Sequence, residues 1–489
     1  MTPAGWGLDD AHRPTTPAPE VLVPHPQTDA VAAHARGRFD ATVARLDAYL
    51  RIPAISCEPA HDGDIRTLAA KIRDDLAALG LDRARVCELD DAHPIVAAEW
   101  LHAGADRPTV LVYGHLDLQP VAGEAWTTAP HVPTVRDGRL YARGAADDMG
   151  GWVSHIGAIE SWFATAGGLP CNLKLIIEGE EEIGSPNLER FMDAYPDVFD
   201  ADVMILTDCE NPSPDLPGLT VSLRGVMEVD VTVSALSADI HSGLWGNLAP
   251  DASTTLVTLL ARLIDADGRP RAPRMDVPAT WREGAWKVPL NAETIRSGAR
   301  LLPGVAPLPD RGTPPAEWAW RQPAITILST TLPRPDQRKN ALRREATATL
   351  SLRIAPGQTA EDLIAMLEET LRRDVPGGCE VTLTRHPGSA QSWLYEPEGP
   401  AFDAVDRAYA KAWGQKPIQI GVGGSIPFVA LFGRRFGDLP LILNGVMDPE
   451  TGAHGPDESM HLGLFEKAID ANARLYAELG ALPELVRRA

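Results

Sequence analysis

The sequence predicts an α/β fold in which a domain with a mostly parallel sheet is interrupted by a ferredoxin-like α+β domain, and three observations support this. Apolar runs rich in β-branched residues at 109–113, 173–177 and 203–207 are typical of buried parallel strands, and a helix-like stretch at 150–166 separates the first two. After residue 217 the segments follow the order βαββαβ of a ferredoxin-like unit. The length of 489 residues exceeds one core of ordinary size, so two domains are expected.

The other segments complete these domains in order along the chain. Apolar residues recur with helical spacing over 39–50 and 65–79, and Gly80 ends the second helix. The βαββαβ series consists of strands 219–233, 324–331, 346–354 and 380–384 with helices 253–264 and 360–372. Helical periodicity returns at 402–413, and the apolar run 441–443 predicts one more buried strand. These last two segments are expected to complete the first domain.

We therefore expect the first domain to be built from two separate parts of the chain. Residues 1–218 form its first part, with a flexible Pro-rich arm at 1–28, and residues 388–489 form its second part. Residues 219–387 form the second domain. Within it, residues 266–323 are rich in proline and hold four tryptophans, which predicts an irregular but packed insertion.

Composition disfavours several classes of function. The net charge of -22 at pH 7 opposes binding to nucleic acids and to anionic membrane surfaces. The five cysteines are scattered without a CxxC pair, so neither a disulfide framework nor a thiolate zinc site is expected. The sequence shows no signal-peptide pattern and no apolar stretch of the roughly 20 residues that a membrane span requires. We expect a cytoplasmic protein.

Acidic and imidazole side chains follow the predicted parallel strands where these end. His115 and Asp117 are two residues apart in an extended chain and so point to the same side. The other candidates are Asp147 and Asp148 between glycines, the run Glu178, Glu180, Glu181 and Glu182, Asp208, and His454 in a Gly-rich loop. Crowded negative charge at the edge of a sheet where α/β folds bind ligands favours bound cations. Each residue alone also fits an ordinary capping, loop or surface role.

Short motifs along nearly the whole chain occur in the order of one enzyme family. They are GHLD, LYARGAADD, EGEEEIGS, the TD at 207–208, the LRG at 223–225, DIHSG, SLRI, GGSIP and GAH. Together they resemble the dinuclear-zinc aminoacylase and carboxypeptidase family of metallopeptidases, and most closely its carnosinase and cytosolic non-specific dipeptidase branch. The whole series carries this resemblance, because no single motif is specific.

The resemblance implies a site for two divalent metal ions. His115, Asp147 and Asp208 would hold one ion, and Asp147 would bridge to a second ion held by Glu182 and His454. Imidazole and carboxylate ligands suit Zn²⁺, with Mn²⁺ or Co²⁺ possible. In the family pattern Glu181 is the general base, and Asp117 orients its neighbours at the metals.

The resemblance also assigns residues that bind the substrate. His241 of DIHSG matches a histidine that reaches across a homodimer, formed through the second or lid domain, to stabilise the oxyanion; a buried lid histidine is the alternative. Arg353, with backbone at Gly424 and Ser425, matches the clamp for a substrate carboxylate, whereas a surface ion pair is the alternative for Arg353. Met149 stands where the family usually has lysine, which bears on subsite charge or local packing.

The leading hypothesis is a metallopeptidase that cleaves the amide bond of a dipeptide or a similar small substrate with a free carboxylate. Hydrolysis of N-acyl or N-carbamoyl amino acids is the alternative, because the same metals and clamp serve both reactions. A catalytically silent metal-binding or interaction protein is a third reading, which the complete ligand series disfavours. Phosphoester hydrolysis also uses two metals, but the sequence has no P-loop and no basic cluster near the ligands.

Overall fold

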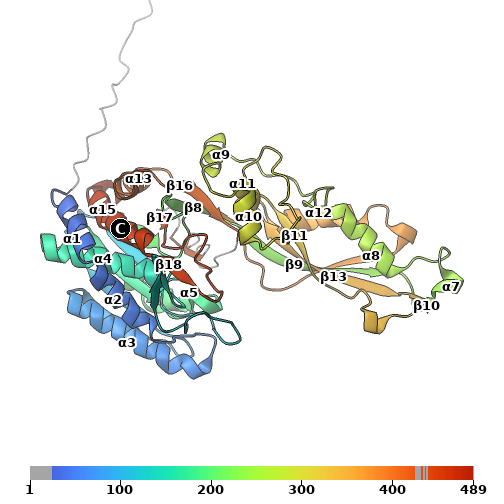
Figure 1. The fold of residues 1–489 in the computed structure, drawn as a ribbon, viewed down its shortest axis with the longest axis horizontal. Coiled ribbons are helices and arrows are strands. Elements are labelled where there is room, and N and C mark those ends of the chain that lie inside the picture. Colours follow the sequence, from blue (N-terminus) through green and yellow to red (C-terminus); the bar gives the residue numbers. More distant parts are fainter. Residues whose placement is uncertain (1–24, 424–430, 433–434, 437–438, 488–489) are drawn as a thin grey trace, which may run out of the picture.

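The computed structural model describes residues 25–423, 431–432, 435–436 and 439–487, which form a rounded unit and an elongated unit (Figure 1). The two ends of the chain build the rounded unit, and the middle of the chain builds the elongated one. Most of the predicted arm, and the predicted substrate residues Gly424 and Ser425, lie outside the described residues. No helix in the described ranges combines the length and the apolar character needed to cross a bilayer.

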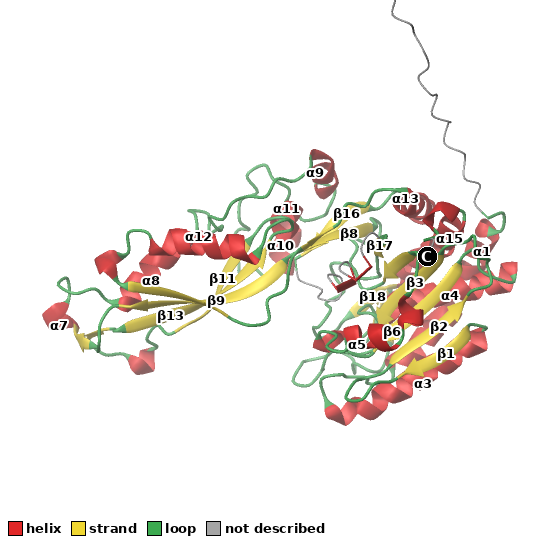
Figure 2. Ribbon diagram, turned by 180° about the vertical axis from the view of Figure 1, so that it is seen from behind, coloured by secondary structure: helices red, strands yellow, loops and turns green. Residues whose placement is uncertain are grey.

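A mixed sheet forms the centre of the rounded unit (Figure 2). In the described part of the chain it has six strands, in the order β1 (Asp82–Cys87), β2 (Ile95–Trp100), β6 (Asn172–Glu178), β3 (Thr109–His115), β7 (Val203–Leu206) and β17 (Leu441–Leu443). Neighbours from β6 to β17 are parallel, whereas β2 is antiparallel to β6 and β1 is antiparallel to β2. The predicted mostly parallel sheet is confirmed, with an antiparallel edge.

Helices cover both faces of this sheet because its strands send apolar side chains alternately to either side. In β3, Val110 and Val112 lie in one buried core, and Leu111 and Tyr113 lie in the other. The first core is covered by α1 (Thr28–Gly37), α2 (Phe39–Leu50), α3 (Asp62–Leu79), α4 (Met149–Ala166), α13 (Pro400–Trp413) and α15 (Leu462–Gly480). The second core is covered by α5 (Leu188–Ala194) and α6 (Pro196–Phe199). Helix α1 lies where the sequence predicted no element.

The elongated unit is a sheet with helices on one face. Its described strands follow the order β11 (Ala324–Thr330), β13 (Glu345–Ile354), β9 (Gly225–Ser234) and β14 (Glu380–Arg385), and all neighbours are antiparallel. The helices α8 (Ala252–Leu260) and α12 (Ala360–Arg372) pack with the buried face of this sheet in a core of their own. This is the ferredoxin-like βαββαβ arrangement that the sequence predicted.

The prediction of one strand over 219–233 was wrong, because the chain changes sheets at Arg224. Strand β8 (Gly218–Leu223) is buried on both faces and joins β15 (Trp393–Leu394) and β16 (Ile418–Val422) in the rounded unit. Strand β9 instead alternates buried and half-buried residues, as a sheet with one covered face requires. The residues on both sides of Arg224 are largely apolar, so the sequence pattern did not reveal the break between the two strands.

The Pro-rich stretch 266–323 is packed, but not on the elongated unit alone. It forms α9 (Ala279–Ala285), α10 (Ala292–Gly298) and α11 (Pro315–Trp320), of which α9 and α11 contact β16. Trp281 and Ala316 belong to the large core of the rounded unit. The carboxylate of Glu317, which is fully buried, pairs with Arg274 and Arg282. The indole of Trp281 is thus buried against the rounded unit, whereas Trp286 is 52% exposed.

Smaller elements connect these parts. The short strands are β4 (Thr134–Arg136), β5 (Arg139–Tyr141), β10 (Ile240–His241), β12 (Ala341–Leu342) and β18 (Ser459–His461). The short helices are α7 (Ser242–Trp245) and the 3-10 turns at Pro59–His61, Glu181–Ile183, Ala261–Leu263, Pro335–Gln337, Pro376–Gly378 and Pro483–Leu485. Strand β18 pairs with β5 and so brings the segment after His454 beside the segment before Asp147.

Candidate metal centre

The predicted ligand residues converge at the carboxyl ends of the parallel strands. His115 is the last residue of β3, Glu178 is the last residue of β6, and Asp208 follows β7. Asp147 precedes α4, and His454 lies in the loop after β17. Because neighbouring parallel strands end at one edge of a sheet, residues far apart in the sequence meet there.

Two groups of side chains lie at this edge, and within each group the ligand atoms are all within 4.8 Å of one another. One group is His115, Glu181 and Asp208, and the other is Asp147, Glu182 and His454. Asp147 joins the groups, because its Oδ1 lies 3.2 Å from Nε2 of His115 and its Oδ2 lies 3.0 Å from Nε2 of His454. Nε2 of His454 is also 3.3 Å from Oε2 of Glu182. A carboxylate between two imidazoles has the geometry of a bridging ligand.

Asp117 organises the residues around these groups. Its carboxylate is fully buried and accepts hydrogen bonds from the backbone N–H of Glu181 (3.1 Å) and of Glu182 (3.0 Å). One of its oxygens lies 3.5 Å from Nδ1 of His115. Asp117 therefore fixes the short turn that carries both glutamates and restrains the imidazole beside it.

The electrostatics of the site favour bound cations. Burial raises the pKa of Asp208 well above its usual value, and the charge of Asp147 raises it further. Burial likewise raises the pKa of Glu181 to about 8. Burial also acts to raise the pKa of Asp147, but hydrogen bonds with His115 and His454 outweigh it and lower that pKa. Divalent cations would offset the repulsion among these carboxylates, and the mixed imidazole and carboxylate donors suit Zn²⁺, Mn²⁺ or Co²⁺.

Close packing holds the start of α4 against the strand ends. Oδ2 of Asp148 accepts a hydrogen bond of 2.6 Å from the Thr207 hydroxyl. A Cβ atom at Gly151 would lie 2.0 Å from the other carboxylate oxygen of Asp148, so only glycine fits this position. Met149 is fully buried in the large core, and the departure from the usual lysine therefore concerns packing at this point.

Two predicted residues lie away from this cluster within the chain. His241 is exposed in β10, at the tip of the elongated unit (Figure 1), where Nδ1 accepts a hydrogen bond from the N–H of Gly243. Arg353 is half-buried on β13. Burial and the nearby charge of Arg353 together lower the pKa of Arg224 to about 10. Arg224 donates to the carbonyl of Gly423 over 3.1 Å.

Several polar residues that contact the cluster were not predicted from the sequence. Gln119 donates a hydrogen bond of 2.7 Å to Oε2 of Glu182. Arg143 and Glu458 form a buried ion pair next to Asp147, with a separation of 2.8 Å. All three lie within or beside the motifs that indicated the family, but only the fold shows their contacts.

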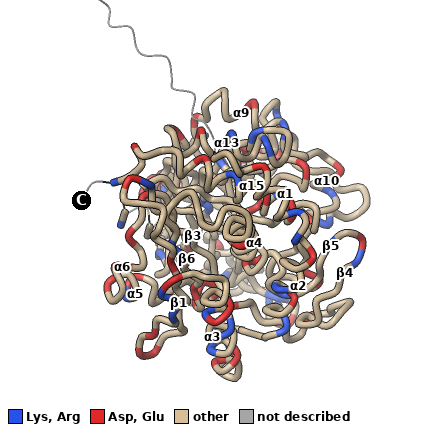
Figure 3. Tube along the Cα trace, turned by 90° about the vertical axis from the view of Figure 1, so that its left-hand side faces the viewer, with Lys and Arg blue, Asp and Glu red and all other residues tan. Residues whose placement is uncertain are grey.

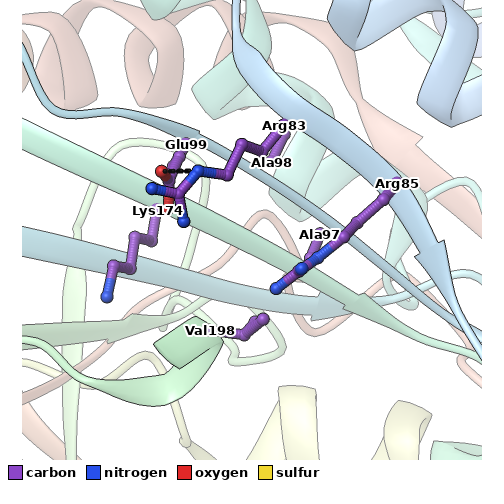
Figure 4. A pocket seen from close by; sticks show the side chains of 7 residues that line it. All are labelled: Arg83, Arg85, Ala97, Ala98, Glu99, Lys174 and Val198. Atoms are coloured by element: carbon purple, nitrogen blue, oxygen red, sulfur yellow. Dashed lines mark ion pairs between the residues drawn. The ribbon is translucent and has the colours of Figure 1, made fainter. Parts of the chain in front are cut away.

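A second polar site, at the antiparallel edge of the sheet, is occupied by its own ion pairs (Figure 4). There Arg83 pairs with Glu99 at 3.0 Å, as the dashed line in Figure 4 marks. Arg85 pairs with Asp197, which is not drawn there, at 2.8 Å. Lys174, the polar residue in an otherwise apolar strand, donates to the carbonyls of Asp197 and Asp200 over 2.6 Å each. The cavity of about 10 Å³ has room for roughly one water molecule. Elsewhere on the rounded unit, Lys and Arg positions are scattered among Asp and Glu positions (Figure 3).

Comparisons with known proteins find related sequences along most of the chain. Residues 111–479 match the model of a family described as Peptidase family M20/M25/M40. The cysteinylglycine-S-conjugate dipeptidase of Corynebacterium striatum is 34% identical over 86% of this chain and 90% of its own length. The human Beta-Ala-His dipeptidase is 28% identical over 80% of this chain and 78% of its own length.

A solved structure shares the fold. The crystal structure of human carnosine dipeptidase 1 superimposes with a TM-score of 0.72, at 24% identity, over 94% of this chain and all of the other. At that identity the likeness supports the fold, and the family assignment depends on the sequence matches. Those matches span most of the chain and confirm the resemblance that the motifs predicted. This chain belongs to the M20/M25/M40 family of peptidases.

Proposed function

We propose that this peptidase is a metal-dependent dipeptidase that uses two divalent ions, with Zn²⁺ favoured by the ligand set over Mn²⁺ or Co²⁺. The observation that carries the proposal is the position of Asp147, whose two oxygens face the imidazoles of His115 and His454. In the proposal His115, Asp147 and Asp208 hold one ion, while Asp147, Glu182 and His454 hold the other. The bound ions would activate a water molecule and polarise the scissile carbonyl.

Glu181 is the proposed general base and acid. Its side chain belongs to the same group as His115 and Asp208, and its backbone is held by Asp117. A carboxylate in this position can take a proton from the attacking water and return it to the leaving amine. Asp117 then acts by orientation alone, because its oxygens are engaged by backbone N–H groups.

The proposed substrate is a dipeptide whose free carboxylate meets Arg353. Its guanidinium lies close enough to Arg224 for the two charges to interact, and two neighbouring cations favour binding of an anionic group. The backbone at Gly424 and Ser425 is proposed to assist. The names of the two relatives support a dipeptide, whereas hydrolysis of N-acyl or N-carbamoyl amino acids is the second candidate. The intact ligand groups argue against a catalytically silent protein.

We also propose that the chain forms a homodimer through residues 219–387, which would act as a lid, with residues 1–218 and 388–489 as the catalytic domain. Strand β11 is an edge strand on which Ile327 and Leu328 are each 52% exposed. Beside it an apolar groove of about 530 Å³ includes Val257 and Leu260 of α8. Exposed apolar edges of this kind favour pairing with a second copy. Such a dimer would let His241 serve the partner's site.

The five cysteines all lie in the described part of the chain and form no disulfide there. This supports the proposed location in the cytoplasm, where thiols stay reduced.

A competition panel tests the substrate class. Metal-reconstituted protein is given α-dipeptides, β-alanyl dipeptides, N-acyl and N-carbamoyl amino acids together, and released amines are measured. We expect the highest kcat/KM for a dipeptide with a free carboxylate, and a large loss when that carboxylate is amidated. Preferred cleavage of an N-acyl or N-carbamoyl amino acid would favour the second candidate.

A further inference from the structure

An ion pair beside the proposed metal site is buried to an unusual degree. Glu458 is fully buried and Arg143 is 1% exposed, with Oε2 of the glutamate 2.8 Å from Nη1 of the arginine. Burying both charges costs solvation energy, which replacement by apolar residues often avoids. This cost indicates that the pair has a role other than stability. Its hydrogen bonds indicate that the role is to position the backbone around it.

The second oxygen of Glu458 holds the backbone that carries Asp147. Its Oε1 accepts hydrogen bonds from the N–H of Ala146 (3.2 Å) and from the N–H of Asp147 itself (3.3 Å). The carbonyl of Glu458 also accepts from the N–H of Ala142 over 3.1 Å. One residue therefore binds the segment 142–147 at both ends.

Glu458 also lies in the loop that presents His454. The pairing of β18 with β5 starts at Ser459, directly after it, and fixes the position of that loop. The distance between Oδ2 of Asp147 and Nε2 of His454 is 3.0 Å, and both atoms belong to the same group of ligands. Glu458 thus joins the two backbone segments from which these ligands extend, and it does so at the amide of Asp147 itself.

Arg143 extends the connection to a third segment. Its Nη2 lies 3.4 Å from the carbonyl of Pro120 and 3.4 Å from Oε2 of Glu124, and its guanidinium is 5.2 Å from the ring centre of Trp126. The segment beginning at Asp117 is thereby tied to the same pair. These contacts fix the orientation of the guanidinium, which in turn fixes the carboxylate of Glu458.

We propose that Glu458, oriented by Arg143, is a positioning residue that sets the spacing of Asp147 and His454 and so the affinity for the metal ion that these residues share with Glu182. The inference rests on the proposed two-metal function. Glu458 itself binds no metal, because its oxygens are taken by two backbone N–H groups and a guanidinium. Partners of this kind typically change metal affinity by about 10- to 100-fold.

The test is a calorimetric titration of metal-free protein with Zn²⁺, accompanied by the absorption spectrum of the Co²⁺ form. In Glu458→Gln we expect one equivalent to bind about 10- to 100-fold more weakly, with the other affinity changed by less than about threefold. We also expect a changed Co²⁺ spectrum, because the coordination geometry shifts.

Asp448→Asn is the matched control. Asp448 forms a buried bidentate pair with Arg139 at 2.9 and 3.0 Å, which joins nearby parts of the same two segments without contacting the amides of 146 and 147. We expect this variant to keep both metal affinities. Unchanged binding in Glu458→Gln would overturn the proposal, and so would equal losses in both variants, because these would indicate a general packing effect.

A double variant covers the case in which Glu458→Gln fails to fold. Arg143→Gln with Glu458→Gln leaves no unpaired buried charge, and we expect a folded protein with the same selective loss. Wild-type affinity for both ions in that protein would also overturn the inference. The wild-type titration separates the two hypotheses: if it does not show two equivalents, the proposed two-metal function itself is wrong.

Discussion

Nε2 of His454 lies 3.0 Å from Oδ2 of Asp147, although the whole elongated unit separates these residues in the sequence. The contact depends on the return of the chain into the sheet as β17, which pairs in parallel with β7. The carboxyl edge of the sheet is therefore completed by the last quarter of the protein. This relationship underlies the predictions on metal binding and turnover.

Removal of metal should abolish activity, and close to two equivalents of a divalent ion should restore it. The expectation follows from two ligand groups that Asp147 connects, because its carboxylate faces both His115 and His454. The check is activity during titration of chelator-treated protein, with metal content measured by elemental analysis. Full turnover by rigorously metal-free protein would contradict the proposed function.

Glu181→Gln should lower kcat by about two to four orders of magnitude while both metals remain bound. Glutamine fills the same volume but cannot accept the proton from water. Metal content and steady-state kinetics are measured on the same sample. Near-normal turnover with both metals in place would show that another residue is the base.

His241→Ala should reduce kcat through loss of about 3 to 4 kcal/mol of transition-state stabilisation, with little change in metal content. The exposed position of His241, at the tip of the elongated unit, predicts that it acts in the site of a partner subunit. The measurement is kcat and metal content of the variant beside the wild type.

Mixing the two inactive variants distinguishes donation between subunits from action within one chain. A dimer of one His241→Ala chain and one Glu181→Gln chain contains one intact site only if His241 is donated by the partner. Random exchange makes half of the dimers mixed, so activity should recover to roughly one quarter of the wild-type value. No recovery, with mixed dimers verified by mass, would exclude donation.

His155, which lies outside the metal site, should make the free energy of unfolding depend on pH. Burial lowers its pKa to about 3, and its ring accepts or donates a 2.7 Å hydrogen bond with the hydroxyl of Tyr476. The unfolded chain binds a proton at this residue below about pH 6.5, whereas the folded chain does not. The stability contributed by neutral His155 is therefore complete above that pH and is lost as the pH falls toward the folded pKa.

The matched variant is His155→Gln, which can keep the hydrogen bond but does not titrate. Between about pH 6 and pH 4, the free energy of unfolding of the wild type should fall by about 1.4 kcal/mol per pH unit more than that of the variant. Urea unfolding at several pH values measures both slopes. Equal slopes would mean that His155 is protonated in the folded protein.

Local sequence patterns predicted much of the fold, because residues at the ends of several helices and strands mark where these elements begin. Helix α12 spans 360–372 as predicted, and its start is fixed by a capping box between Thr359 and Asp362. Strand β17 spans 441–443 as predicted, because a short apolar run follows Pro440. The break at Arg224 was missed, although the alternation of Met227, Val229 and Val231 with polar residues begins just after it.

Some residues of the candidate site could be predicted from the sequence more directly than others. His115 and Asp208 stand at strand ends, so the geometry of a parallel sheet predicts that they meet. His454 is a single histidine in a loop, and only the series of family motifs indicated it. The role of Glu458 depends on contacts with the amides of 146 and 147, which no spacing along the chain encodes.

The chain leaves the rounded unit after β8 and returns to it at β15, and Leu223 and Trp393 face each other across these two strands. The outgoing and returning segments thus run side by side, and Val226 and Ala390 form a further bridge just beyond them. The backbone passes between the two units only through this pair of neighbouring segments in the described part of the chain, whereas residues 266–323 add side-chain contacts to the rounded unit. Sequence changes in the elongated unit, away from these two strands and from 266–323, can therefore leave the strand register of the ligand-bearing sheet unaltered.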